Sequence, residues 1–542
     1  MSDTAGPAVA GGDGRGQGNF GSSLKWSYIM DGGRQISLIV VSLLIARIVG
    51  PENWGIIALA TLAILMMELL HRHSLQPAII QRDDISDITL KTSFWISVGF
   101  GVLLALTVVG LSGPYSRLIE IDDPIEFAAK SSELRNVLLV LAVTLPLRGT
   151  TLVNEALMQR SMDFKRLATP INGSTILGGI VGVIMAFAGY GIWAMVGQQI
   201  VQVAAQTVLV FRVDAWRPGM SFSTEKARDL LGFSSGSAVM SLGNVINERG
   251  ADILIGAMFG PLAVGLYRFA SRFVTMLLNI ATNALGAISI PELARHQHDP
   301  KAFNSRVIDL IRAGTVLTFP LLAILAINAQ SLIDIMGNEW NDAVVPLQLL
   351  CVWAAGRAML GFVTPMLEAL GRPHDAAKLS WAAAAVSLTA FFLGGQLLGD
   401  SSTSTQIAGI SALRLIVTVL LLLPMYMAVV RHVTGVKIAG LATAVGPSVF
   451  SALVVTFVGL AATWTIDAIG AHFLVRMFVV GSLTGLAALV ALANTEPAIK
   501  AKIDAFRAKR NNPAPSPEVP DSRPAPNQTE APQPVSDKQA AA

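Results

Sequence analysis

Cysteine, charge and nucleotide-binding motifs are scarce in this sequence. Its single cysteine, Cys351, excludes an intramolecular disulfide and any metal site built from several cysteines. No G-x-x-x-x-G-K-[ST] motif occurs, so the chain carries no P-loop ATPase of its own. Only 14% of the 542 residues are charged, against about 25% in ordinary soluble domains. These absences exclude a disulfide scaffold, a P-loop pump and a typical soluble protein.

Apolar residues dominate instead. They make up 53% of the chain, and the mean hydropathy of +0.58 requires many apolar runs of about 20 residues. The sequence therefore predicts an all-α polytopic membrane protein. We expect fourteen spans, at roughly 24–49, 54–71, 90–112, 134–157, 166–188, 190–211, 228–250, 262–290, 305–328, 343–370, 376–398, 405–430, 438–464 and 472–494.

A repeated segment divides the chain into two halves. Residues 44–55 read LIARIVGPENWG, and residues 254–265 read LIGAMFGPLAVG. A second match, Glu155-Ala156-Leu157 with Glu368-Ala369-Leu370, follows in the same order. Two such matches predict two homologous halves, the architecture of a transporter that rocks one half against the other. In the first match, Leu44, Ile45, Gly50, Pro51 and Gly55 recur as Leu254, Ile255, Gly260, Pro261 and Gly265.

The charge of the loops predicts the orientation. Loops on one side of the membrane are rich in Lys and Arg, whereas loops on the other side are neutral or acidic. Positive loops stay in the cytoplasm, so both termini are expected there, as the even number of spans also requires. The predicted parts are a disordered tail (1–23), an N-lobe (24–212), a cytoplasmic inter-lobe loop (213–227), a C-lobe (228–431), two further spans (432–494) and a basic, proline-rich cytoplasmic tail (495–542).

Polar side chains form stripes along several predicted spans. Arg268, Arg272, Asn279 and Asn283 fall within a sector of about 60° at 100° per residue. A charged side chain in lipid costs roughly 2.5–3.5 kcal/mol, so such stripes require a wet or protein-lined interior. Further candidates are Arg148 with Glu155, Arg357 with Glu368, Asp31 with Arg34, and Glu248, Arg312 and Arg414.

Arginine outnumbers carboxylates among these mid-span candidates. A net cationic cavity favours an anionic substrate. The fixed charge and forked donors of arginine suit phosphate particularly well. Each stripe also has a structural interpretation, in which arginines neutralise carboxylates and lock helices together. The arginines are Arg34, Arg148, Arg268, Arg272, Arg312, Arg357 and Arg414, against Asp31, Glu155, Glu248 and Glu368.

Two histidine pairs, His71-Arg-His73 and His296-Gln-His298, are expected in cytoplasmic loops. Neither has a cysteine or a carboxylate pair at metal-ligand spacing nearby. We therefore interpret them as surface histidines and predict neither a metal site nor a cofactor.

These features together resemble a known family. The G-P-x-x-x-G turn in each half and the stretches GLYRFASRFVTMLLN and LEALGRPHDAAKL are similar to the polysaccharide-export branch of the multidrug/oligosaccharidyl-lipid/polysaccharide superfamily, the Wzx-type flippases. The resemblance covers about residues 20–495. It implies two six-helix lobes around a central cavity, with two extra C-terminal helices, in the bacterial inner membrane.

The family also implies a substrate. This is undecaprenyl diphosphate carrying an oligosaccharide repeat unit, moved from the cytoplasmic to the periplasmic leaflet for lipopolysaccharide, exopolysaccharide or capsule assembly. Expected partners are this lipid-linked oligosaccharide, membrane lipid, a polysaccharide polymerase and a chain-length regulator. Neither catalysis nor nucleic-acid binding is expected. The implied mechanism is alternating access, in which arginines capture the diphosphate while the polyprenyl tail stays in lipid.

Three alternatives and one question about the carboxylates remain open. A drug/cation antiporter of the same superfamily has this topology but needs an acidic cavity. A lipid II flippase shares the fold, and a membrane-embedded polymerase or ligase usually has a larger outer loop. Glu155 or Glu368 either carries a coupling proton or pairs with Arg148 or Arg357, and we favour the pairing.

Overall fold

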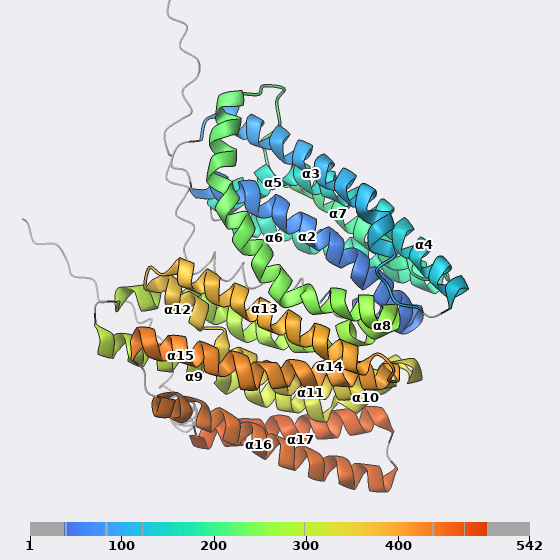
Figure 1. The fold of residues 1–542 in the computed structure, drawn as a ribbon, viewed down its shortest axis with the longest axis vertical. Coiled ribbons are helices and arrows are strands. Elements are labelled where there is room, and N and C mark those ends of the chain that lie inside the picture. The colour runs from blue at the N-terminus through green and yellow to red at the C-terminus, as the bar shows by residue number, and fades with distance from the viewer. Residues whose placement is uncertain are drawn as a thin grey trace, which may run out of the picture. The chain divides into compact units, whose positions relative to one another are not determined.

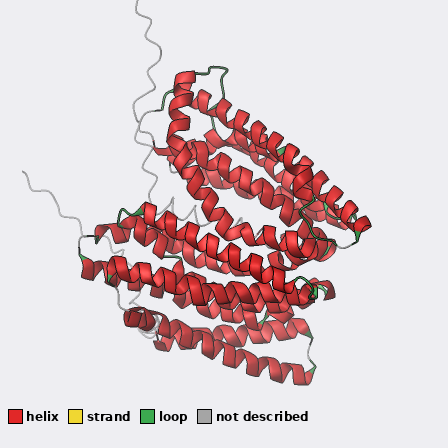
Figure 2. Ribbon diagram, in the orientation of Figure 1, coloured by secondary structure: helices red, strands yellow, loops and turns green. Residues whose placement is uncertain are grey.

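The computed structural model describes residues 37, 41–81, 85–121, 123–161, 163–297, 299–435, 438–470 and 472–495. Side chains are described in these ranges except at 73–75, 77–78, 81, 164, 229, 231–248, 280–292, 373, 438–439 and 441. Throughout this part of the chain the regular structure is helical, with no strand (Figure 2).

The helices follow one another with short connections. Residues 41–49 are helical and lead into the first labelled helix. The elements are α2 (Pro51–Gln81), α3 (Asp87–Ser116), α4 (Pro124–Leu141), α5 (Thr144–Arg160), α6 (Phe164–Phe187), α7 (Trp193–Val213), α8 (Thr224–Arg295), α9 (Pro300–Ile327), α10 (Ala329–Met336), the 3-10 helix η1 (Asn338–Ala343), α11 (Val344–Leu360), α12 (Val363–Ala369), α13 (Pro373–Leu398), α14 (Thr403–Val417), the π-helix η2 (Thr418–Leu422), α15 (Leu423–Thr434), α16 (Ile438–Ile469) and α17 (Phe473–Thr495).

Twelve helical segments of the described residues are long and apolar enough to cross a membrane. They correspond to twelve of the fourteen spans predicted from the sequence. The other two predicted spans, 24–49 and 228–250, fall largely on residues or side chains outside the described set. The membrane class is therefore confirmed, and the number fourteen stays a prediction.

The outer faces of these helices are apolar. Large side chains such as Leu106, Ile184, Phe392, Phe457 and Phe478 are exposed on them. So much exposed apolar surface is unfavourable in water and suits contact with lipid tails. These faces agree with a multi-pass membrane protein.

The helices gather into two bundles (Figure 1). Helices α2–α7 pack mainly against one another, and we call them the N-terminal bundle. Helices α8–α15 form the C-terminal bundle, and α16 packs on its helix α9. The most extensive contact between the two bundles is that of α2 with α8.

Helix α2 is longer than the sequence predicted. The apolar span was expected to end at residue 71, but the helix continues to Gln81. Ile79 is fully buried in a small apolar cluster with Leu152 and Val153 of α5, which stabilises the added turns. His71 and Arg72 consequently lie within a helix and not in a loop, and the earlier placement of both was wrong.

Each half of the chain turns at the repeated Gly-Pro pair. Gly50 and Gly260 have φ angles of 83° and 78°, in the left-handed region that favours glycine. The proline after each glycine has its φ already fixed for the first turn of a helix and lacks an N–H that would need a partner. The turn precedes α2 in the first half, and it interrupts α8 in the second half.

The two copies of the repeat meet in space. A Cβ atom placed on Gly55 would lie 1.8 Å from the carbonyl oxygen of Pro261, and one on Gly265 would lie 1.9 Å from that of Pro51. Only glycine permits this approach, as in other helix crossings that use small residues. The recurring G-P-x-x-x-G sequence therefore forms a reciprocal crossing of α2 and α8, which we call the glycine crossing.

Further contacts join the bundles at the same end. The backbone N–H of Glu120, in the loop between α3 and α4, donates to the carbonyl of Gly256 in α8 at 3.3 Å. The carboxylate of Glu339 approaches Gly50, within 3.3 Å of a Cβ placed there. The acidic loops and the glycine crossing therefore lie at the same end of the helices.

Candidate substrate cavity

Three cavities run through the interior, and neighbouring ones share lining residues. The N-terminal cavity (520 Å³) lies among α2, α5, α6 and α7. The central cavity (330 Å³) is lined by both bundles, and the C-terminal cavity (340 Å³) lies among α8, α11, α13, α14 and α15. The central cavity shares Thr61, Gln199 and Gln202 with the first, and Arg249, Ser271, Thr275 and Asn279 with the last. The three cavities therefore adjoin one another at these shared residues, and each has polar side chains in its lining.

Arginines and aromatic rings line the C-terminal cavity. The guanidinium of Arg414, from α14, lies 4.0 Å from the ring centroid of Trp353 and also donates to the Tyr267 hydroxyl. The indole N–H of Trp353 donates to the Thr418 hydroxyl at 3.0 Å. Thr418 opens the π-helix η2, an irregularity that is common at functional sites. Arg357, from α11, adds a second charge to this wall.

The central cavity is cationic as well. Arg249, Arg268 and Arg272, all from α8, line it. Arg268 pairs with the buried Asp252, its Nη1 lying 2.8 Å from the carboxylate. Arg272 lies 5.7 Å from the ring centroid of Trp54 in α2, so it is placed where the two bundles meet.

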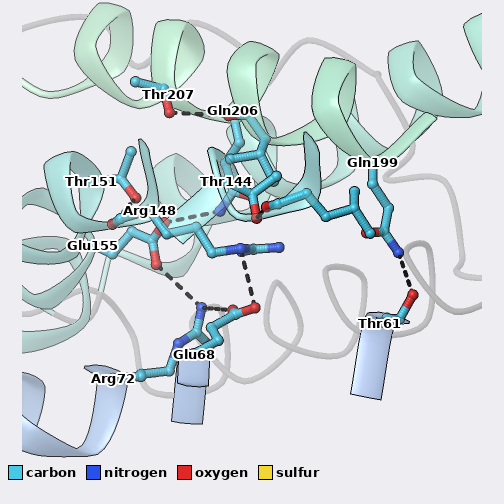
Figure 3. A network of polar contacts seen from close by, with 12 residues as sticks. Thr61, Glu68, Arg72, Thr144, Arg148, Thr151, Glu155, Gln199, Gln206 and Thr207 are labelled. Atoms are coloured by element: carbon cyan, nitrogen blue, oxygen red, sulfur yellow. Dashed lines mark hydrogen bonds and ion pairs between the residues drawn. The ribbon is translucent and has the colours of Figure 1, made fainter. Parts of the chain in front are cut away.

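The N-terminal cavity contains a chain of alternating charges (Figure 3). Arg148 Nε lies 3.2 Å from Glu68, which also lies 3.9 Å from Arg72. Arg72 in turn lies 3.7 Å from Glu155. Gln206 of α7 donates to Glu155 at 2.9 Å. These contacts tie α2, α5 and α7 together around the cavity.

Charge is therefore distributed unevenly among the three cavities. Among the described residues that line the central and C-terminal cavities, five are arginines and one, Asp252, is acidic. In the N-terminal cavity, the two arginines of the described lining are matched by two glutamates. An anionic group is attracted to the first region, whereas the second region has no net charge to offer it.

The structure brings most of the predicted site residues to these cavities. Arg268, Arg272 and Asn279 line the central cavity, and Arg357, Arg414 and Asn279 line the C-terminal one. Arg148 and Glu155 line the N-terminal cavity. Neither Arg312 nor Glu368 is among the lining residues. The residues whose side chains lie outside the described set are Asp31, Arg34, Glu248 and Asn283.

The arginine partners differ from those expected within single helices. Glu155 contacts Arg72 of α2, and Arg148 contacts Glu68 of α2. In the other half, the chain leaves regular helix between Leu360 and Val363, so the periodicity that placed Arg357 and Glu368 on one face is interrupted. The expected pairs within one helix are therefore corrected to pairs between helices in the N-terminal bundle.

The prediction that His71 is a surface histidine is also wrong. It is buried in α2, with its Nε2 2.9 Å from the Ser97 hydroxyl and its ring edge-to-face with Phe100. This histidine is a core residue between α2 and α3 and not a surface residue. His296 caps the end of α8.

Several lining residues were not predicted from the sequence. Arg249 stands at the end of a predicted span beside Glu248, and a search for charge at span ends would have found it. Arg72 was missed as a lining residue because the predicted span ended at residue 71, and Glu68 was missed although it lies inside that span. The amides of Gln198, Gln199, Gln202 and Gln206 recur at helical spacing along α7, a stripe as regular as those that were recognised.

We expect Glu155→Gln to lower the melting temperature and to leave the pH dependence of transport intact. The change weakens contacts with Arg72 and Gln206, and hydrogen bonds to charged groups contribute about 1.5–3 kcal/mol. We expect a loss of stability at the lower end of this range, because the Arg72 side chain is 43% exposed and water screens its charge. Thermal unfolding of purified protein, with the exposed Glu126→Gln as control, measures the effect. A normally folded variant that no longer responds to an imposed pH gradient would instead assign proton coupling to Glu155.

Apolar spans around an internal polar cavity, with two bundles that meet at duplicated motifs, define a multi-pass membrane transport protein. The chain belongs to the family described as "Polysaccharide biosynthesis protein", whose profile matches residues 44–345. It is 22% identical to the succinoglycan biosynthesis transport protein ExoT of Rhizobium meliloti, over 65% of this chain and 69% of that protein. It is 23% identical to the lipopolysaccharide biosynthesis protein WzxC of Escherichia coli, over 70% and 75%.

Solved structures share the fold. The lipid II flippase MurJ in an inward closed conformation aligns with a TM-score of 0.66, 12% identity, and coverage of 89% of this chain and all of that chain. An inward-facing multidrug resistance MATE family transporter aligns with a TM-score of 0.61 and 12% identity, covering 74% and 96%. At such identities the likeness concerns the fold alone, and the function has to be argued from the cavity.

Proposed function

We propose that this protein is an inner-membrane flippase that moves undecaprenyl-diphosphate-linked oligosaccharide units from the cytoplasmic to the periplasmic leaflet. The observation that carries the proposal is the cationic lining of the central and C-terminal cavities. Among the described lining residues, five arginines and one aspartate suit a diphosphate, whose oxygens accept hydrogen bonds from the forked N–H groups of arginine. A cation antiporter would need the opposite balance.

The family supports the class of cargo. Relatives carry the names of transport or biosynthesis proteins for succinoglycan and lipopolysaccharide. A polymer assembled outside the cytoplasm from units made inside it requires each polar, lipid-linked unit to cross the bilayer. An internal polar space provides that path, because it keeps the sugars and phosphates out of the hydrocarbon.

Alternating access is the mechanism that this arrangement favours. The bundles are held together by the glycine crossing at the end that bears the acidic loops, which we assign to the periplasm. Substrate then enters from the cytoplasmic side, and separation of the crossing releases it outward. The polyprenyl tail remains in lipid throughout.

Deletion of the gene tests the proposal. Surface polysaccharide should fall, and lipid-linked oligosaccharide should accumulate in the cytoplasmic leaflet, where an impermeant periodate reagent cannot oxidise it from outside. Complementation with the wild-type chain should reverse both effects. Unchanged polysaccharide together with greater susceptibility to cationic drugs would reject the flippase and favour the antiporter.

Cysteine labelling should confirm the proposed orientation. In a Cys351→Ser background, we expect cysteines at Arg217 and Lys378 to resist an impermeant maleimide added to intact cells. Cysteines at Asp123 and Ser402 should be labelled, since they lie in the neutral or acidic set of loops. All four positions are exposed, so access alone decides the result. Labelling of position 217 from outside would reverse the orientation of the cavity.

A further inference from the structure

Helix α7 presents a row of neutral amides to the cavities, in addition to the arginines proposed to hold the diphosphate. Gln199, Gln202 and Gln206 lie within a sector of about 60° on this helix, and all three line the N-terminal cavity. Gln199 and Gln202 also line the central cavity, and Gln198 joins them there. Four amides turned inward on one membrane helix indicate a polar ligand or partner at this wall.

These amides retain hydrogen-bonding capacity towards the cavity. Gln199 donates through Nε2 to the Thr61 hydroxyl at 3.0 Å, and Gln202 donates through Nε2 to the Thr175 hydroxyl at 3.3 Å. None of the described residues donates to the Oε1 atom of either glutamine. Each amide offers two N–H donors and an oxygen with two lone pairs, so an acceptor and a donor remain on each.

The charge of the N-terminal cavity identifies the kind of ligand. Its charged groups are balanced and engaged with one another, from Arg148 through Glu68 and Arg72 to Glu155. A phosphate placed here would meet two carboxylates as well as two arginines that are already paired with them, so it would gain no net attraction. A hydroxyl both donates and accepts, so it matches a wall of amides and paired charges without changing the net charge.

We infer that the glutamine face of α7 binds the uncharged sugar portion of the substrate, while the arginines of the central and C-terminal cavities hold its diphosphate. This inference rests on the proposed function. The N-terminal cavity is the largest of the three, at 520 Å³, as a unit of several sugars requires. Gln199 and Gln202 stand at its border with the central cavity, so a diphosphate near Arg272 places its sugar beside them.

The test compares two ligands on the purified full-length protein. One is undecaprenyl diphosphate without sugar. The other is the lipid-linked oligosaccharide fraction extracted from membranes of a strain that lacks this gene. We expect wild-type protein to bind the extract at least tenfold more tightly. Gln199→Ala/Gln202→Ala should lose roughly this tenfold advantage, because it removes two or more neutral hydrogen bonds, and should bind the bare diphosphate normally.

Two further variants keep the test decisive. Gln202→Leu preserves volume while removing the amide, and should reduce the advantage in part even if the double variant folds poorly. Gln348→Ala, an exposed amide of α11, should behave as wild type. A double variant that keeps the tenfold advantage, or that loses affinity for the bare diphosphate as well, overturns the assignment of the sugar to α7.

The outcomes separate this inference from the proposed function. Wild-type protein that binds the bare diphosphate and gains nothing from the sugar overturns the inference and leaves the flippase standing. Wild-type protein that binds neither ligand rejects the proposed function itself.

Discussion

Gly55→Ala is expected to open the glycine crossing and to abolish most polysaccharide export. The added Cβ would lie 1.8 Å from the Pro261 carbonyl oxygen, whereas carbon and oxygen normally approach to about 3.3 Å. The two helices would have to part by roughly 1.5 Å. Overpacking of this kind costs about 1–3 kcal/mol, which shifts the closed state against the open one by about 5–150-fold.

Pulsed spin-label distances measure the shift directly. Labels at Glu126 and Asn341, both exposed and on opposite bundles, should move apart in Gly55→Ala relative to the unmodified protein. Gly265→Ala should have the same effect, because it meets the Pro51 carbonyl in the reciprocal contact. The double variant should add little, since both changes break one interface.

The control is Gly110→Ala in α3, where nothing lies within 4 Å of the new Cβ. Alanine is the better helix former by about 0.8–1.0 kcal/mol, so this variant should be neutral or slightly stabilised. Unchanged spin-label distances and normal export in Gly55→Ala would show that the crossing is not required to close tightly during transport.

The glycine crossing also explains why the repeat was readable from sequence. A close approach of two backbones admits only glycine at positions 55 and 265, and a sharp turn needs glycine and proline just before them. Such constraints act on residue identity itself, which explains why the same residues stand at the corresponding positions of both segments. The rest of the two segments packs against different neighbours, and its side chains differ accordingly.

Helix faces were predictable for a related reason. Membrane helices turn their polar residues inward, and a fixed angle per residue reveals the stripe. Arg268, Arg272 and Asn279 were placed in this way and do line a cavity. The glutamines of α7 follow the same rule. They were not predicted as site residues, because they are uncharged.

The ion pairs between helices could not be predicted from periodicity. Periodicity fixes the face on which Arg148 lies, but its partner depends on which helix packs there. That helix proved to be α2, which brings Glu68 to Arg148 and Arg72 to Glu155. The end of α2 was missed because the added turns are held by tertiary contacts of Ile79 and not by a run of apolar residues.

The partner of Arg268, Asp252, was likewise not predictable from periodicity, and this pairing affects how the role of Arg268 can be tested. The sequence treats Arg268 and Arg272 alike, one turn apart on one face. In the structure, Arg268 is held by the buried carboxylate of Asp252, whereas Arg272 packs beside Trp54 of the other bundle. The two arginines therefore differ in the described groups that they contact.

Arg272→Ala should weaken the binding of undecaprenyl diphosphate tenfold or more. Charge-assisted hydrogen bonds contribute about 1.5–3 kcal/mol, and 1.4 kcal/mol corresponds to a factor of ten in affinity. Lysine should rescue binding in part, because it keeps the charge and loses the planar fork. Surface polysaccharide should fall when the variant is compared with the unmodified protein at equal amounts in the membrane.

Arg268→Ala should lower stability as well, because it leaves Asp252 buried without its partner, and loss of one member of a buried pair costs about 3–5 kcal/mol. Arg268→Met/Asp252→Leu should recover much of that stability and still bind the diphosphate weakly, which separates the two roles. Arg431→Ala, an exposed arginine at the end of α15, is the matched control and should change neither property. Normal diphosphate affinity in a well-folded Arg272→Ala protein would remove this residue from the site and shift the cationic wall to Arg249, Arg357 and Arg414.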